Sequence, residues 1–188
     1  MRVTVNNHPI QWLQRSIWTP DKCEEVIRTL DALKSDKAAV MGGKPGRSKA
    51  RNCNITWVPK EHQYGWIYED IEKVFNEAAD FFMFDIQEMQ QLQYTTYYPW
   101  NYYRKHTDNG HNDVGVQTRK LSMSVNLSPP LSYSGGRLRI WAKTGRKAPK
   151  TQGTATVFPS FLWHQADTVW RGTRKALIAW AVDEEGFT

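Results

Sequence analysis

Apolar side chains recur at helical spacing in two segments of the first half of the chain. The first segment opens with Thr19-Pro20-Asp21, which is typical of a helix start because proline is tolerated in the first turn. The second segment runs from about Gly65 to Phe82. The apolar positions are Cys23, Val26, Ile27, Leu30 and Leu33 in the first segment, and Trp66, Ile67, Ile71, Val74, Phe75, Ala78 and Phe82 in the second. This spacing predicts two amphipathic helices.

From Gln90 onward the pattern changes to short extended runs, which glycine, proline and asparagine separate. A similar run, "RNCNITWV", lies between the two helices. Many short strands in succession are typical of an antiparallel sandwich or barrel. The later runs are "QLQYTTYY", "YYRKH", "KLSMSVNLS", "RLRIWA", "GTATVF" and "RKALIAWA". We expect a mainly β fold with flanking helices, in which a double-stranded β-helix, or jelly roll, is buttressed by the amino-terminal helices.

Length and composition fit one globular unit. A chain of 188 residues with 40% hydrophobic residues is ample for one core and short for two. We therefore expect a single domain over residues 1–188. Within it, residues 1–89 form a helical and strand support region and residues 90–184 form the jelly-roll core.

Cysteine usage and hydropathy bear on where the protein works. Cys23 and Cys53 have no paired spacing, which favours a reducing compartment over a disulfide framework. The apolar runs are all shorter than the ~18 residues that a membrane span needs, and the amino terminus does not resemble a secretory signal. We expect a cytoplasmic protein with no membrane partner. Nothing in the pattern predicts an oligomeric state.

The charge leaves several partners open. A net charge of +6 and a pI near 9.3 suit nucleic acid, an acidic protein or an anionic small molecule. Much of the excess lies in residues 42–51 and 137–150, which are rich in turn residues. Solvated loops are the simplest interpretation of both segments.

The run "KLSMSVNLS" has two distinct faces. Its leucine, methionine and valine side chains alternate with Ser122, Ser124 and Asn126. The apolar face can pack against helices or a second sheet. The polar face is directed either to solvent, as in many antiparallel sheets, or to a wet cavity.

Candidate metal ligands occur in the stretch "YYRKHTDNGHND", which contains His-x-Asp twice. On an extended segment, His106 and Asp108 point the same way, and His164 can supply a third ligand from a later strand-like run. Two imidazoles and one carboxylate on one face of an octahedron suit non-haem Fe(II) oxygen chemistry. The second pair, His111 and Asp113, lies in the turn-like "NGHNDVG".

Arg174 opens the last strand-like run, on the same face as Ala176 and Ile178. An arginine that faces a barrel interior needs an anion, and a carboxylate matches its planar fork. A surface salt bridge at a strand end is the alternative interpretation. The three candidate metal ligands favour an interior position for Arg174.

Taken together, these motifs resemble the Fe(II)/2-oxoglutarate-dependent dioxygenases, and within them the prolyl 4-hydroxylase-like group. The usual order of motifs in that group is Tyr-x5-Tyr-x2-His-x-Asp, a Gly-Gly turn, Phe-Pro or Tyr-Pro, and His-x9-Arg/Lys. The matching positions are Tyr97, Tyr103, His106, Asp108, Gly135-Gly136, Phe158-Pro159, His164 and Arg174. The resemblance covers about half the chain, roughly residues 90–184. One departure is Trp100, next to Pro99, where the family often has glycine, so the loop over the cofactor is expected to differ in shape.

The resemblance implies a site. Fe(II) would be held by His106, Asp108 and His164, whereas His111 and Asp113 would lie outside it. The distal carboxylate of 2-oxoglutarate would pair with Arg174 and the Tyr97 hydroxyl, in a pocket lined by Ser122 and Asn126. Dioxygen is the other cosubstrate, succinate and CO2 are the products, and ascorbate is a candidate reductant.

The substrate is less well defined. The resemblance favours a prolyl residue in a peptide or protein, on which Trp100, Tyr102 and Trp163 could stack. Tyr103 and Trp180 are candidates for the pocket itself.

Other target classes remain open. A free amino acid is plausible, and nucleic acid is possible for a basic protein but not favoured, because the basic segments are not interleaved with aromatic residues in the sequence. A non-catalytic jelly-roll module that keeps a structural metal is a further alternative. A hydrolytic zinc site would leave Arg174 unexplained.

Overall fold

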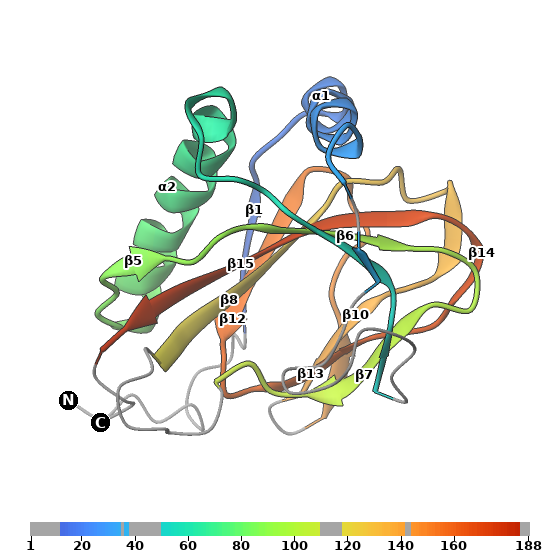
Figure 1. Ribbon diagram of the computed structural model, residues 1–188. Helices are drawn as coiled ribbons and strands as arrows, with labels where there is room; N and C mark the ends of the chain where they lie inside the picture. Colours follow the sequence, from blue (N-terminus) through green and yellow to red (C-terminus); the bar gives the residue numbers. More distant parts are fainter. Residues whose placement is uncertain (1–11, 35, 38–49, 110–117, 142–143, 185–188) are drawn as a thin grey trace.

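A computed structural model describes residues 12–34, 36–37, 50–109, 118–141 and 144–184. In these residues two antiparallel sheets face each other, with the helices on the outer side of the larger one (Figure 1). The larger sheet has the order β1-β12-β8-β15-β6-β4-β2, with β5 beside β15, and the smaller has the order β11-β10-β13-β7-β3. This is the jelly roll that the run of short strands predicts.

The elements lie in the following ranges. The larger sheet contains β1 (Leu13–Ser16), β2 (Asp36–Lys37), β4 (Asn54–Trp57), β5 (Glu88–Met89), β6 (Gln93–Tyr97), β8 (Thr118–Asn126), β12 (Thr154–Pro159) and β15 (Arg174–Asp183). The smaller sheet contains β3 (Arg51–Asn52), β7 (Tyr102–His106), β10 (Leu138–Trp141), β11 (Gly145–Lys147) and β13 (Trp163–Ala166). A two-stranded sheet pairs β9 (Tyr133–Gly135) with β14 (Val169–Gly172). The helices are α1 (Pro20–Asp31), the 3-10 helix η2 (His62–Tyr64) and α2 (Gly65–Phe82).

Both predicted helices form where the apolar spacing places them. In α1 the Thr19 side chain accepts a hydrogen bond from the backbone N–H of Lys22 at 3.3 Å, which caps the first turn. The second helix, α2, ends at Met83, whose left-handed backbone (φ 55°) stops it. Their apolar faces pack on the larger sheet and form its main core. None of the helices that the structure describes is long and apolar enough to cross a membrane.

The central strand β8 separates this core from a second, polar interior. Met123 and Val125 pack in the helix-side core. Ser122, Ser124 and Asn126 point to the other side, toward the smaller sheet, and each is less than 8% exposed. The polar face of this strand is therefore an inner wall and not a solvated surface.

The amino-terminal half contributes strands as well as helices. The run "RNCNITWV" forms two strands that part at Cys53, so that β3 joins the smaller sheet beside β7 and β4 joins the larger sheet beside β6. The unpredicted strand β1 pairs with β12 at the edge of the larger sheet. The predicted support region thus completes both sheets.

Candidate active site

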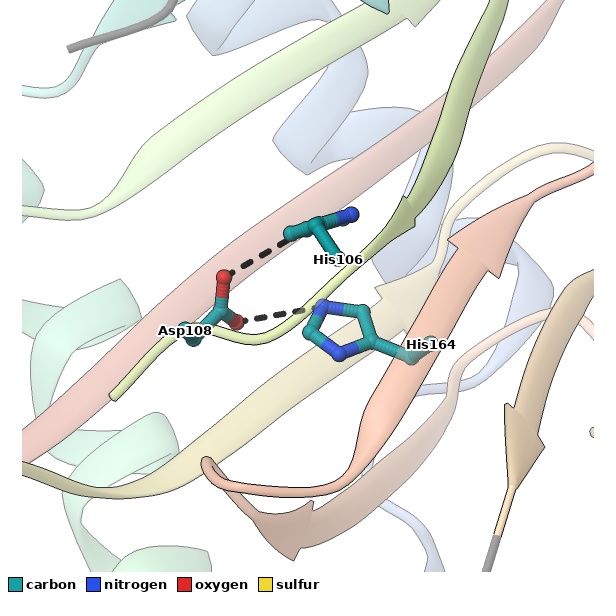
Figure 2. Close-up of side chains that lie close together, drawn as sticks. All are labelled: His106, Asp108 and His164. Carbon is teal, nitrogen blue, oxygen red and sulfur yellow. Dashed lines mark ion pairs between the residues drawn. The ribbon is translucent and has the colours of Figure 1, made fainter. Parts of the chain in front are cut away.

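Three potential metal ligands converge between the two sheets (Figure 2). His106 ends β7 and lies directly opposite His164 of β13, and Asp108 follows two residues later. The Asp108 carboxylate lies 3.4 Å from Nε2 of His106 and 3.2 Å from Nε2 of His164. One ligand atom from each residue lies within 4.8 Å of the others. The pair His111 and Asp113 lies outside the described residues.

Backbone contacts orient both imidazoles. Nδ1 of His106 lies 2.7 Å from the Arg104 carbonyl, and Nδ1 of His164 lies 3.0 Å from the Leu162 carbonyl. Since a carbonyl only accepts, each Nδ1 carries the proton and each Nε2 has a free lone pair. Both lone pairs are directed at the side where the carboxylate lies, which is the donor set that a divalent transition metal requires.

The Asp108 carboxylate is positioned by the larger sheet. Its Oδ2 accepts hydrogen bonds from the Ser122 hydroxyl at 2.8 Å and from the Trp180 indole at 2.9 Å. The Ser122 hydroxyl also contacts that of Ser160 at 2.8 Å. Oδ1 is left facing His106, so this oxygen is available to an ion.

Burial and charge act against each other in this cluster. Burial alone would raise the pKa of Asp108, but the two histidines hold it well below its ordinary value. Burial lowers the pKa of His106, with Asp108 opposing the shift. The pKa of His164 is raised because its contact with Asp108 outweighs burial. The carboxylate is therefore ionised and adjacent to two nitrogen ligands.

Arg174 lies in the same pocket, which extends from the metal-ligand cluster to this side chain. It is 4% exposed and pairs across the sheet with Tyr97, over whose ring the guanidinium lies at 5.3 Å. Its Nη2 makes a long hydrogen bond of 3.4 Å to the Ser124 hydroxyl. Within the described residues, Arg174 has no carboxylate partner.

The Gly135-Gly136 turn makes room for this arginine. Both glycines have positive φ, and a Cβ on Gly136 would lie 3.2 Å from Cδ of Arg174 and 2.8 Å from a methyl group of Val169. A side chain at Gly136 would thus press on the arginine and on the strand behind it.

The other predicted cosubstrate residues lie at different depths. Ser122 lies beside the metal ligands, as its contact with Asp108 requires. Asn126 lies farther along β8, where its amide donates to the carbonyls of Ser128 and Lys150 and its oxygen accepts from the Tyr133 hydroxyl at 3.0 Å. It borders a small cavity behind Arg174 and not the metal pocket.

The predicted aromatic residues divide into two groups. Tyr103 stacks on His106 at 3.6 Å between ring centroids, and Trp180 contacts Asp108, so both line the metal pocket. Trp100 and Trp163 are 65% and 51% exposed and lie outside the described lining of that pocket. Trp100 has a positive φ of 69° and packs on Trp170.

Several pocket residues were missed in the sequence. Arg51 is 8% exposed and donates hydrogen bonds to Cys53 and Gln93. The guanidinium of Arg119 lies 3.9 Å from the Trp180 ring. Gln93 could have been found by counting back from Tyr97 in steps of two along β6, but no motif marks either arginine.

Comparison with known proteins agrees with this geometry. Residues 92–182 match the sequence model of the 2OG-Fe(II) oxygenase superfamily, and they include all three potential metal ligands and Arg174. Over these residues, which are just under half of the chain, the sequence is similar to that superfamily. Within the superfamily, it resembles the prolyl 4-hydroxylase-like group.

Relatives and solved structures give the same picture. The chain is 35% identical over 81 residues to a PKHD-type hydroxylase of Thermosynechococcus vestitus, an alignment that covers 42% of this chain and 36% of the relative. It is 33% identical over 98 residues to one of Crocosphaera subtropica, covering 50% and 43%. The chain thus spans less than half the length of these curated relatives.

A Pseudomonas putida prolyl-4-hydroxylase superposes with a TM-score of 0.75 at 19% identity, over 95% of both chains. A Trichoplax adhaerens prolyl hydroxylase in complex with a hypoxia inducible factor peptide superposes with a TM-score of 0.76 at 14% identity, over 96% of this chain and 86% of that one. At these identities the superpositions establish the fold.

Proposed function

We propose that this protein is an Fe(II)- and 2-oxoglutarate-dependent dioxygenase that hydroxylates a C–H bond, with a prolyl residue of a peptide or protein as its substrate. The observation that carries the proposal is one pocket with two complementary ends. One end has three ligand atoms within 4.8 Å of one another, and the other has a buried arginine that no described carboxylate neutralises.

The donor set fits Fe(II). His106, Asp108 and His164 would hold the ion, with both Nε2 lone pairs already directed toward it. Two imidazoles and one carboxylate leave adjacent coordination positions for a cosubstrate and dioxygen. With both groups bound, the iron would activate O2, which is the oxidant. Oxidative decarboxylation of 2-oxoglutarate to succinate and CO2 would take one oxygen atom, and the hydroxylated product would take the other.

Arg174 would bind the distal carboxylate of 2-oxoglutarate. A planar guanidinium and a carboxylate form two parallel hydrogen bonds, and burial strengthens them. Tyr97 would assist as a neutral donor, because burial raises the pKa of its phenol far above neutral pH. A dicarboxylic acid can thus bridge the metal and the arginine.

Aromatic rings at the outer end of the pocket support a prolyl substrate. The Trp180 indole donates a hydrogen bond to Asp108. The ring of Trp57, which is 44% exposed, lies 6.4 Å from the Trp180 ring between centroids. The guanidinium of Arg119 lies 3.9 Å from the Trp180 ring and can donate to a peptide carbonyl. A flat, apolar wall with one nearby donor suits a proline ring and its backbone. The names of the relatives and structural neighbours point to the same class.

The cellular compartment is proposed from the two cysteines alone. Cys23 and Cys53 are both buried free thiols. Free thiols suit the cytoplasm, where we propose that the protein acts.

The direct test combines two assays. Iron-loaded protein is incubated with 2-oxoglutarate, and ascorbate if it is needed, against a library of proline-containing peptides. Succinate release and products heavier by the mass of one oxygen atom support the proposal. If succinate forms and an amino acid or oligonucleotide is modified instead of a peptide, the dioxygenase reaction is supported but the prolyl substrate is wrong. If succinate forms under none of these conditions, a non-catalytic metal-binding module becomes the better interpretation.

A further inference from the structure

A broad cleft of about 870 Å³ has walls from β7, β10 and β13 of the smaller sheet and from the β9–β14 pair. It shares Tyr103 and Ala166 with the metal pocket, and its remaining lining is separate. We call it the basic cleft, because its lining includes Arg104, Arg137, Arg139, Lys147 and Lys150.

These cations are poorly matched by acidic groups. Asp167 is the carboxylate in the described lining, and it is already engaged by Arg139 at 3.2 Å and by Gln165 at 2.6 Å. Arg104, Arg137 and Lys147 have no carboxylate partner within the part of the chain that the structure describes. The cleft therefore carries a net positive charge that the described residues do not neutralise.

The cations are also close enough to repel one another. Burial lowers the pKa of Lys150, and the nearby charges of Arg137 and Arg174 lower it further. Its ammonium group is held by the Tyr133 carbonyl at 2.8 Å and lies 3.6 Å from that ring. An anion in the cleft would relieve this repulsion.

Flat aromatic rings stand beside the cations. Trp170 lines the cleft and is 57% exposed, and it packs edge to face on Trp100, with 5.3 Å between ring centroids. Arg104 lies over Tyr102, another lining residue, at 5.3 Å. The fold thus interleaves basic and aromatic side chains that are separate in the sequence, which removes the sequence argument against nucleic acid.

We propose that the basic cleft binds single-stranded nucleic acid, with phosphates on Arg104, Arg137 and Lys147 and a base stacked on Trp170. Single-strand sites combine a positively charged groove with exposed rings, because every base offers a flat face. An acidic peptide would use the cations but would leave the Trp170 face without a role. This binding site lies beyond the proposed hydroxylation and requires neither iron nor 2-oxoglutarate.

Fluorescence anisotropy on the metal-free protein tests the proposal. The probe is a labelled oligo(dT) of about 15 nucleotides, near the upper end of common single-strand site sizes, with oligo(U) as a second probe. We expect Trp170→Ala to weaken binding about 5- to 150-fold, the range for losing one stacked base. The double variant Arg137→Gln/Lys147→Gln should reduce the slope of log affinity against log salt by about 1.4, since each phosphate contact on a single strand contributes about 0.7.

A matched control variant removes one arginine and one lysine from a surface outside the basic cleft. Arg28 and Lys73 are exposed on α1 and α2, so Arg28→Gln/Lys73→Gln should leave the salt slope unchanged. Thermal unfolding of each variant checks that it is folded. The proposal is overturned if neither oligonucleotide binds, or if the control lowers the slope as much as the cleft variant. It is also overturned if a poly-glutamate peptide displaces the oligonucleotide at lower concentration than unlabelled oligo(dT) does, because the cleft then prefers acidic peptides.

Discussion

The two ends of the metal pocket differ in how far the protein satisfies its own polar groups. At the metal end, Asp108 accepts hydrogen bonds from Ser122 and Trp180, and both histidines are held by backbone carbonyls. At the other end, Nη2 of Arg174 has a long 3.4 Å contact with the Ser124 hydroxyl, and no described carboxylate pairs with the guanidinium. Buried charge is tolerated when hydrogen bonds surround it and is costly when they do not. The protein's own hydrogen bonds therefore orient the metal end, whereas the arginine end offers a charged donor that a carboxylate ligand can pair with.

The largest expected effect is at the metal end. His106→Ala removes one of three ligands, and we expect Fe(II) binding to fall by more than the ~10–100-fold that loss of a partner behind a ligand costs. Anaerobic titration with Fe(II) measures this loss. His111→Ala is the control and should bind one ion per chain as the parent does. The reverse result would move the site to the second His-x-Asp pair.

Substitutions at the arginine end should lower the affinity for 2-oxoglutarate. Arg174→Ala leaves a carboxylate without its charged donor, which should cost roughly 2–5 kcal/mol, or about thirtyfold to several thousandfold. Arg174→Lys keeps the charge but loses the two-pronged contact, so its loss should be smaller. The absorption band that 2-oxoglutarate produces with anaerobic Fe(II) protein reports both.

Arg171→Ala, at an exposed position on β14, is the matched control for Arg174→Ala. Iron affinity should remain nearly unchanged in all three variants. If Arg174→Ala binds 2-oxoglutarate as tightly as the parent does, the buried Arg51 becomes the anchor, because it lines the same pocket.

The partners of Asp108 should give an intermediate effect. Ser122→Ala and Trp180→Phe each remove one hydrogen bond to Oδ2, and we expect each to lower Fe(II) affinity by about 10–100-fold. Ser132→Ala removes an exposed hydroxyl that bonds only to a local carbonyl and should have no effect. Unchanged iron binding in both pocket variants would mean that the metal end is not organised by these contacts.

The smallest effect should come from Tyr97→Phe, which removes one hydroxyl beside Arg174. We expect a loss in 2-oxoglutarate affinity of about 0.5–1.5 kcal/mol, the usual contribution of one hydrogen bond. Tyr98→Phe, at the half-exposed next position, is the control. A loss as large as that of Arg174→Ala would show that the arginine end depends on the phenol as much as on the charge.

Local patterns in the sequence predicted the elements well. The helix start at Thr19-Pro20 and the alternation in β8 each depend on neighbouring residues, and both lie where expected. Alternation also placed Arg174 on an inward strand face, and the resemblance to a known family grouped it with His106, Asp108 and His164, which line one pocket with it.

Features that depend on strand register could not be predicted in this way. The pairing that places His164 opposite His106 is a property of the assembled sheet. Arg51 reaches the pocket because its strand pairs with β7, and no local signal carries that information. The basic cleft is a similar case, since its cations and rings come from five or more separate strands and loops. Of the two basic segments, residues 42–51 lie mostly outside the described residues, whereas 137–150 contributes directly to the cleft.

The two faces of β8 have a consequence for how such a protein can evolve. Met123 packs under the helices, while its neighbours Ser122 and Ser124 touch Asp108 and Arg174. A substitution that shifts the strand by a fraction of an ångström to accommodate a new core residue moves both ends of the pocket together. Selection for activity therefore also restrains the apolar interior here, and lineages are expected to change the helices that cover β8 more readily than the strand itself.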